Sequence, residues 1–210
     1  EIGQDWAGMG SELSRMFADA KDDVEALKFI TGLGDASNEP EGLLVGATTT
    51  VDSATDETFA IDDLFAVEEA LGARFRSRAS WVANRKLYNL TRRFADTDGP
   101  EVYVNNLREG IGNNGGPMNA TLLGYPAYEA SSMPSVPASY TDDMKVAVFG
   151  DFRHFLIVDK IGMTVELIPH LVGTNRRPTG QRGLYAYWRN TSKVLAPNAF
   201  RALNITEAVS

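Results

Sequence analysis

Residues 145–168 read KVAVFGDFRHFLIVDKIGMTVELI, and this stretch marks the point at which the chain becomes β-rich. It contains three runs of mostly β-branched and aromatic residues, which are typical of β-strands. Further runs of the same kind follow towards the C-terminus. The strands expected from this point onward are 145–151, 155–158, 163–168, 184–189, 193–195 and 200–205. The last third of the chain is therefore predicted to be β structure.

The N-terminal segment has a helical pattern. Apolar residues recur there at steps of three and four, which predicts a long amphipathic α-helix. They are Trp6, Met9, Leu13, Met16, Ala20, Val24 and Leu27. Gly32 and Gly34 are expected to end this helix as a left-handed C-terminal cap. We expect the apolar stripe to lie on the protein's own sheet, with a coiled-coil seam as the alternative.

Short elements alternate between these two regions. Asp62 or Asp63 is predicted to cap a helix that runs through Phe75, and Asn84 a helix that runs through Phe94. Strands are expected at 81–83, 102–104 and 122–126, with a tight turn at Asn114–Gly115. The order of one long helix, a small mixed block and then long strands predicts an α+β fold with two subdomains.

Composition and charge limit the classes of function. The 210 residues are 43% hydrophobic and include no cysteine, so disulfides and thiolate chemistry are excluded. The net charge of -8 is unevenly distributed, because residues 1–105 carry 20 acids and 10 bases whereas residues 106–210 carry 8 acids and 10 bases. This asymmetry suggests acidic and basic faces that meet within the fold or between copies, and it argues against simple coating of nucleic acid.

The chain offers few residues for catalysis or metal binding. Its two histidines, His154 and His170, lie sixteen positions apart without accompanying carboxylates at ligand spacing. The acidic pairs Asp62–Asp63 and Glu68–Glu69 are interpreted as helix-capping and solvent-exposed residues. We therefore expect no catalytic residue, no metal and no cofactor.

The segment 173–183 reads GTNRRPTGQRG and has some features of a phosphate-binding loop. A Walker loop needs four residues between its glycines, then Gly-Lys, and a helix after it. Here six residues separate Gly173 from Gly180, Gln181 takes the place of lysine, and a strand is expected to follow. The segment is interpreted as a flexible basic loop that enters a strand. A nucleotide-binding enzyme remains the alternative.

Several strings resemble the major capsid proteins of tailed bacteriophages, which have the Hong Kong 97-type fold. They include Gly150-Asp151-Phe152, residues 156–160 and 163–167, Leu123-Gly124-Tyr125-Pro126, Ser132-Met133-Pro134, Gly180-Gln181-Arg182-Gly183 and Pro197-Asn198-Ala199-Phe200. Residues 29–34 and 40–44 resemble the family's junction after its long spine helix. The order and spacing of these strings extend over nearly the whole chain.

The resemblance implies a spine helix packed on long strands and a mixed α/β axial domain. A peripheral domain would comprise residues 1–45 and 155–210, and the axial domain residues 46–154. The family's N-terminal arm and extended loop normally precede the spine helix, and the 210 residues contain neither. The resemblance therefore implies the core of a larger protein, and we expect this chain to be a monomer or weak oligomer in solution.

The resemblance also implies a structural function rather than an enzymatic one. The protein is expected to assemble into pentamers and hexamers of an icosahedral virion head that encloses double-stranded DNA, after assembly in the cytoplasm of a bacterial host. Scaffold, portal or cementing proteins are possible partners, no membrane is expected, and an encapsulin-like compartment is the alternative. Some family members crosslink their shells through a lysine on the extended loop and an asparagine, assisted by a glutamate. Gly180 and Tyr187 lie near the asparagine and glutamate positions, and the lysine-bearing loop is not among the 210 residues, so crosslinking is not expected. Predicted subunit contacts join Asp19, Asp22 and Asp23 to Arg176, Arg177 and Arg182.

Overall fold

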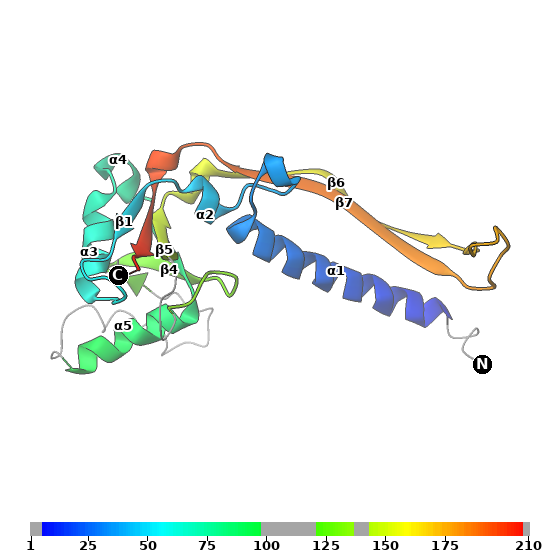
Figure 1. The fold of residues 1–210 in the computed structure, drawn as a ribbon, viewed down its shortest axis with the longest axis horizontal. Coiled ribbons are helices and arrows are strands. Elements are labelled where there is room, and N and C mark those ends of the chain that lie inside the picture. Colours follow the sequence, from blue (N-terminus) through cyan, green and yellow to red (C-terminus); the bar gives the residue numbers. More distant parts are fainter. Residues whose placement is uncertain (1–5, 98–120, 137–142, 208–210) are drawn as a thin grey trace.

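The computed structural model describes residues 6–97, 121–136 and 143–207 (Figure 1). It combines a compact part built on a six-stranded sheet with an elongated part, in which helix α1 (Trp6–Thr31) runs beside a long two-stranded ribbon. The predicted α+β class and the predicted N-terminal helix are thereby confirmed. The strand expected at 102–104 and the turn expected at Asn114–Gly115 lie outside the described residues.

The six-stranded sheet has the strand order β1-β8-β5-β2-β4-β3. Its strands are β1 (Thr50–Asp52), β2 (Ser80–Ala83), β3 (Thr121–Leu122), β4 (Tyr125–Glu129), β5 (Met144–Gly150) and β8 (Phe200–Ile205). β5 pairs antiparallel with both β2 and β8, whereas β1 pairs parallel with β8 and β2 parallel with β4. The C-terminal strand β8 therefore lies inside the sheet, between the edge strand β1 and β5, which both come from earlier parts of the chain.

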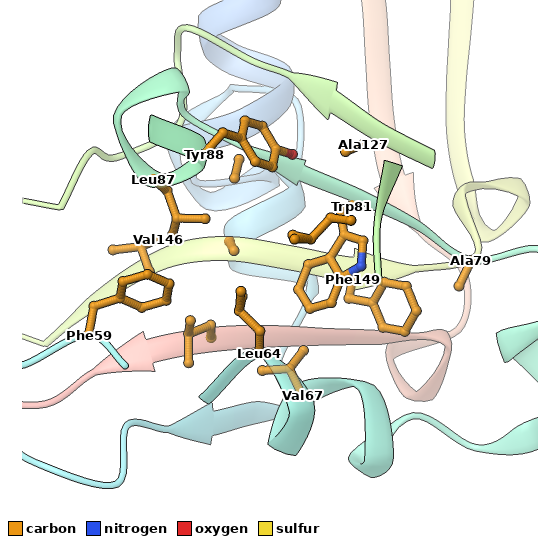
Figure 2. Close-up of a cluster of buried hydrophobic side chains, with 14 of the residues drawn as sticks. Phe59, Leu64, Val67, Ala79, Trp81, Leu87, Tyr88, Ala127, Val146 and Phe149 are labelled. Atoms are coloured by element: carbon orange, nitrogen blue, oxygen red, sulfur yellow. The ribbon is translucent and has the colours of Figure 1, made fainter. Parts of the chain in front are cut away.

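The main core packs around two aromatic rings on neighbouring strands (Figure 2). Trp81 of β2 and Phe149 of β5 are register partners, and their rings stack with centroids 4.4 Å apart. Leu64 and Val67 reach this core from a helix, and both are fully buried. Because each buried aromatic side chain removes about 150–250 Å² from water, this pair is a main source of the sheet's stability.

Three helices lie around the sheet, and polar side chains accept hydrogen bonds from backbone N–H groups at the start of the first and the third of them. They are α3 (Ile61–Ala70), α4 (Ala73–Arg76) and α5 (Arg85–Thr97). The predicted cap of α5 is confirmed, because Asn84 Oδ1 accepts the Lys86 N–H at 3.1 Å. The predicted cap of α3 is wrong in position, since Ala60 is the N-cap residue and the Asp63 carboxylate accepts the Ala60 N–H at 2.8 Å from the third helical position. The helix predicted to run through Phe75 is divided, because Leu71 is extended and buried.

The ribbon consists of β6 (Phe155–Ile168) and β7 (Gly183–Val194), which pair antiparallel. The sequence predicts four short strands here, and the structure has two long ones. The register shifts between Asp159 and Ile161 and again between Ile161 and Thr164. Such irregularities accommodate extra residues without ending a strand, which is why the interrupted pattern still forms one continuous element.

The junction between α1 and the rest of the chain depends on two glycines. It includes the 3-10 helix η1 (Asp35–Ser37) and the short helix α2 (Leu43–Gly46). The Gly42 N–H donates to the Gly32 carbonyl at 2.8 Å, and a Cβ on Gly42 would lie 2.5 Å from the Gly32 nitrogen. Of the two glycines predicted to form a left-handed cap, only Gly34 has a positive φ (87°). Gly32 is instead needed because the Pro40 carbonyl leaves no room for a side chain.

The expected peripheral domain includes all of residues 155–210, but β8, which lies in this range, is hydrogen-bonded to the six-stranded sheet. Residues 155–194 supply the ribbon, but Phe200–Ile205 pair with β5 and β1 in the six-stranded sheet. Two further 3-10 helices, η2 (Phe152–His154) and η3 (Pro197–Ala199), lie where the chain passes between the sheet and the ribbon. The division into two domains itself stays a prediction.

We predict that Gly42→Ala lowers the free energy of unfolding by about 1–3 kcal/mol, because the new methyl group would overlap the backbone of Gly32 and Ile30. Gly72→Ala is the matched control, since nothing lies within 4 Å of a Cβ there. Chemical denaturation of the three proteins measures the difference. Equal stabilities of the two variants would contradict the close backbone approach at the junction.

Candidate functional site

The candidate site is a surface rather than a cavity, and it covers α1 and the ribbon. Large apolar side chains are exposed on both elements. On α1 they are Met16, Val24 and Leu27, and on the ribbon Leu156, Ile157, Val158, Ile161, Leu167, Ile168 and Tyr185. Met16 is 63% exposed, although it belongs to the apolar stripe of the predicted helix. Extended apolar surfaces of this kind mark sites of protein–protein contact.

The ribbon also exposes its backbone. Among the described residues, β6 pairs only with β7, so each strand has one edge without a sheet partner. A two-stranded ribbon is marginally stable alone, and free strand edges are templates for pairing with another chain. The ribbon therefore presents both apolar side chains and unpaired backbone groups to a potential partner.

One acidic residue fixes the base of the ribbon to the junction. The Val194 N–H donates to Glu41 Oε1 at 3.1 Å, and the Ser192 hydroxyl donates to the Glu41 carbonyl at 2.8 Å. The Glu41 N–H in turn donates to the Ser192 carbonyl at 3.1 Å. Since Ser192 and Val194 are buried, these hydrogen bonds lie in a low-dielectric region where they are strong.

A lysine joins the same junction to the six-stranded sheet. The Lys145 ammonium donates to the Leu44 carbonyl at 2.6 Å and to the Ala47 carbonyl at 3.1 Å. These carbonyls belong to the C-terminal turn of α2, where a positive charge is favourable. Burial lowers the pKa of the Lys145 ammonium. Lys145 lies at the register shift in β5, which directs its side chain to α2.

Contacts along α1 hold the helix beside β7. The Asn190 side-chain amide donates to Glu25 Oε1 at 2.6 Å, and Lys21 forms an ion pair of 2.7 Å with the same oxygen. The hydrogen bond to Glu25 raises the pKa of the Lys21 ammonium. Glu25 thus connects a charged residue of the helix to a polar residue of the ribbon.

An open groove of about 890 Å³ lies between the η1 turn and the ribbon. Its lining includes Asp35, Glu39, Asp159, Lys160 and Arg189. Glu39 is fixed there, because its carboxylate accepts from the Lys28 ammonium at 2.6 Å and from the Leu33 N–H at 3.3 Å. These two donors, Lys28 first, hold the pKa of the Glu39 carboxyl below its ordinary value.

The basic loop between β6 and β7 lies at the end of the ribbon that is remote from the sheet (Figure 1). Some of its backbone N–H groups donate within the loop: Arg176 N–H donates to the Gly173 carbonyl, and Gly173 N–H to the Arg177 carbonyl. The loop leads into β7 rather than into a helix. It therefore lacks the helix N-terminus that supplies the N–H groups of a phosphate cradle.

Two of the predicted basic contact residues, Arg176 and Arg177, do not pair with the predicted acidic ones in the part of the chain that the structure describes. Asp19, Asp22 and Asp23 are exposed along α1, and Arg176, Arg177 and Arg182 are exposed in the loop. Among the described residues, Arg176 and Arg177 form no ion pair with the three aspartates. Pairing of these two arginines with the α1 acids inside one molecule is thus not observed, and a contact between copies stays a prediction.

The described residues also offer little for catalysis. No group of three or more histidine, cysteine, aspartate or glutamate residues in the described ranges is arranged to hold a metal ion. The His154 ring packs edge-on against Phe75, with centroids 5.4 Å apart, as a structural residue does. Nor is any helix in this part of the chain both long and apolar enough to span a bilayer.

Sequence reasoning missed Glu41, Lys145 and the Glu25–Asn190 pair. Each hydrogen bond joins residues more than 95 positions apart, so no local pattern identifies it. Of these residues, only Glu41 lies in a stretch that the sequence analysis singled out, residues 40–44. That stretch indicated the junction after the spine helix and did not indicate that Glu41 binds β7.

Comparisons with known proteins identify a family and solved structures that this chain resembles. A model of the phage capsid family matches residues 2–205. The capsid chain of an empty GTA particle aligns with a TM-score of 0.73 and 25% identity, over 94% of this chain and 66% of that chain. The Gordonia phage Cozz structure aligns with a TM-score of 0.57 and 18% identity, over 97% and 65%.

An encapsulin of Synechococcus elongatus, the holo-SrpI complex, shares the fold with a TM-score of 0.58 and 13% identity, over 96% of this chain and 67% of that one. A comparison with curated proteins finds no significant match. The chain spans about two thirds of the length of the solved capsid chains that it matches.

We predict that acid weakens the η1 turn through Glu39. Because the folded-state pKa of Glu39 is below its ordinary value of 4.5, its stabilisation is present above the unfolded-state pKa and is lost as the pH falls through the folded-state pKa. Hydrogen exchange at the Leu33 and Gly34 amides, corrected for intrinsic rates, should lose protection on acidification in the wild type and less in Glu39→Gln. Glu12→Gln is the control, and equal pH sensitivity of wild type and Glu39→Gln would contradict the role of the carboxylate.

Proposed function

The chain belongs to the phage capsid family, and we propose that it is a structural major capsid protein whose copies assemble into an icosahedral head around phage or prophage DNA. The observation that carries this proposal is the family match over residues 2–205, to which the exposed ribbon and α1 add a physical reason. A surface with free strand edges and exposed apolar side chains is suited to repeated contact with further copies.

The mechanism is self-association through many weak contacts. Different surfaces of neighbouring copies that meet with a constant rotation form closed rings, which here would be pentamers and hexamers. Each contact can be weak, because contacts in a closed assembly act together. The division into a peripheral part (1–45 and 155–210) and an axial part (46–154) belongs to this proposal, with β8 hydrogen-bonded in the sheet of the axial part.

The further parts of the proposal concern activity, partners and location. The protein turns over no substrate, and its main partner is another copy of itself. Assembly takes place in the cytoplasm of a bacterial host, and scaffold, portal or cementing proteins are its further proposed partners. An encapsulin-like compartment is the second candidate, which the shared fold of the SrpI encapsulin supports only at the level of the fold.

We predict that titration with ATP or GTP gives no saturable binding at micromolar concentrations. The basic loop leads into a strand rather than a helix, and some of its backbone N–H groups already donate within the loop, so it lacks the helix N-terminus of a phosphate site. Isothermal titration calorimetry on the 210-residue chain measures this. Saturable micromolar binding that disappears in Arg176→Ala/Arg177→Ala would support the nucleotide-binding alternative instead.

One specific contact is proposed between the loop and α1 of a neighbouring copy. Arg176 and Arg177, together with Arg182, would face Asp19, Asp22 and Asp23. The supporting observations are the exposure of both groups and the lack of an ion pair between the two loop arginines and these aspartates within the described chain. Complementary charges of this kind select partners and fix their register.

We predict that Arg176→Glu/Arg177→Glu in the full-length protein reduces the yield of shells by roughly tenfold, because like charges would then face each other. Negative-stain electron microscopy and sedimentation measure the yield. Arg176→Lys/Arg177→Lys keeps the charge and is the matched control. Adding Asp22→Arg/Asp23→Arg to the reversed variant should restore assembly, and normal yield in the reversed variant alone would reject this contact.

A further inference from the structure

One end of the six-stranded sheet gathers arginines. Arg201 lies at the start of β8, Arg78 precedes β2, and Arg153 follows β5, and register pairing brings these three strand ends together at Ser80, Gly150 and Phe200. The helix α4 adds Arg74 and Arg76 at the same end, since Phe75 contacts His154. We call these five arginines the basic end; among the described residues none of them forms an ion pair.

Two arginines of the basic end are fixed by the backbone. Arg76 donates to the Leu71 carbonyl at 2.9 Å, and Arg201 donates to the Ala70 carbonyl at 3.1 Å, so both cap the C-terminus of α3. The other three, Arg74, Arg78 and Arg153, are exposed. The acids nearby are Glu68, Glu69 and Asp151; Glu68 accepts from the Tyr125 hydroxyl, and buried Asp151 caps η2. The arginines outnumber these acids.

The opposite end of the same strands gathers acids. Asp52 ends β1, Asp143 precedes β5, and Glu207 follows β8, while Asp56 and Glu57 lie in the loop after β1. All five are exposed, and we call them the acidic end. Hydrogen bonds to the end of β8 hold them together: Asp52 accepts from Asn204, Asp56 from the Thr206 hydroxyl, and Asp143 from the Glu207 N–H.

The acidic end is not arranged as a metal site. No metal-binding group of carboxylates occurs within the described ranges, and three of these acids are already engaged by protein donors. Its exposed carboxylates are complementary in charge to a basic protein surface, and the chain itself carries such a surface at the other end of the sheet.

The two ends cannot neutralise each other within one molecule. β8 has six residues, and at about 3.3 Å per residue it separates the ends by roughly 20 Å. This distance is about twice the Debye length of roughly 8–10 Å at physiological salt, so the attraction within one chain is largely screened. Figure 1 shows α4 near the start of β8 and away from the end of that strand.

We infer that the acidic end of one copy docks against the basic end of the next, so that the sheets of neighbouring copies lie head to tail around a capsomer ring. The contact joins two different surfaces, and such heterologous contacts are the ones that close into rings. This inference rests on the proposed capsid function and adds a specific interface to it. It uses none of the residues proposed for the contact between the loop and α1.

The test reverses each end separately in the full-length protein. The basic-end variant is Arg74→Glu/Arg78→Glu/Arg153→Glu, and the acidic-end variant is Asp56→Lys/Glu57→Lys/Glu207→Lys. We expect each to reduce the shell yield by roughly tenfold or more, because like charges then meet at every contact. The variant with all six changes should recover the wild-type yield to within about twofold. Arg74→Lys/Arg78→Lys/Arg153→Lys is the control that preserves charge, and thermal melting checks that each variant folds.

A mixture of the basic-end and acidic-end variants provides a second measurement. The basic-end variant has two acidic ends and the acidic-end variant has two basic ends, so the two should alternate when mixed. An alternating order closes in a ring of six but not in a ring of five. We therefore expect the mixture to form hexamers and hexamer-based sheets or tubes rather than closed shells, as seen by electron microscopy.

The outcomes separate this inference from the capsid proposal. Shells at normal yield from either single-end variant would overturn the inference and leave the capsid proposal intact. Normal shells from the basic-end variant that contain less DNA would also overturn it, and would assign the arginines to nucleic acid. Failure of the six-change variant to recover while it melts like the wild type would contradict pairing between the ends. Failure of the wild type itself to form shells would overturn both proposals.

Discussion

The structure depends on how a two-stranded ribbon is attached to the rest of the molecule. A ribbon of this length has no core of its own, so its position is set where it meets the junction after α1. Glu41 supplies that attachment with both its backbone and its side chain, through Ser192 and Val194. The attachment forms only because Gly32 and Gly42 allow the backbones on either side of the turn to approach closely.

The junction connects three parts of the chain that the sequence separates widely. α1 reaches it from one side, the ribbon from another, and Lys145 joins it to the central sheet through the carbonyls of α2. The junction thus determines how the elongated and the compact parts lie relative to each other. The exposed apolar surfaces of both elongated elements gain their orientation from these few hydrogen bonds.

Much of the fold could be predicted from the sequence where the pattern is local. The apolar stripe from Leu13 to Leu27 identified α1, and Asn84 identified the start of α5. Prediction failed where distant contacts decide the outcome. The irregular register near Asp159 and Ile161 keeps β6 continuous, and the burial of Leu71 divides α3 from α4. The position of β8 between β1 and β5 follows from pairing with residues far away in sequence, which no local pattern records. For the candidate surface, the arginines and aspartates were found as charges, but their spatial separation and the role of Glu41 needed the structure.

Because the ribbon is attached at one end, a small rotation at its base produces a large displacement of its tip. Its anchors, Glu41 and Asn190, both act on the half of β7 that is nearer the sheet. β6 has fourteen residues, so at about 3.3 Å per residue the ribbon extends roughly 45 Å. A rotation of about 5° at the base then moves the tip by roughly 4 Å, a displacement similar to the spacing of adjacent strands. In the proposed shell, such a rotation would let the same chain meet its neighbours at different angles without any change in its core, as a curved surface tiled by identical pieces demands.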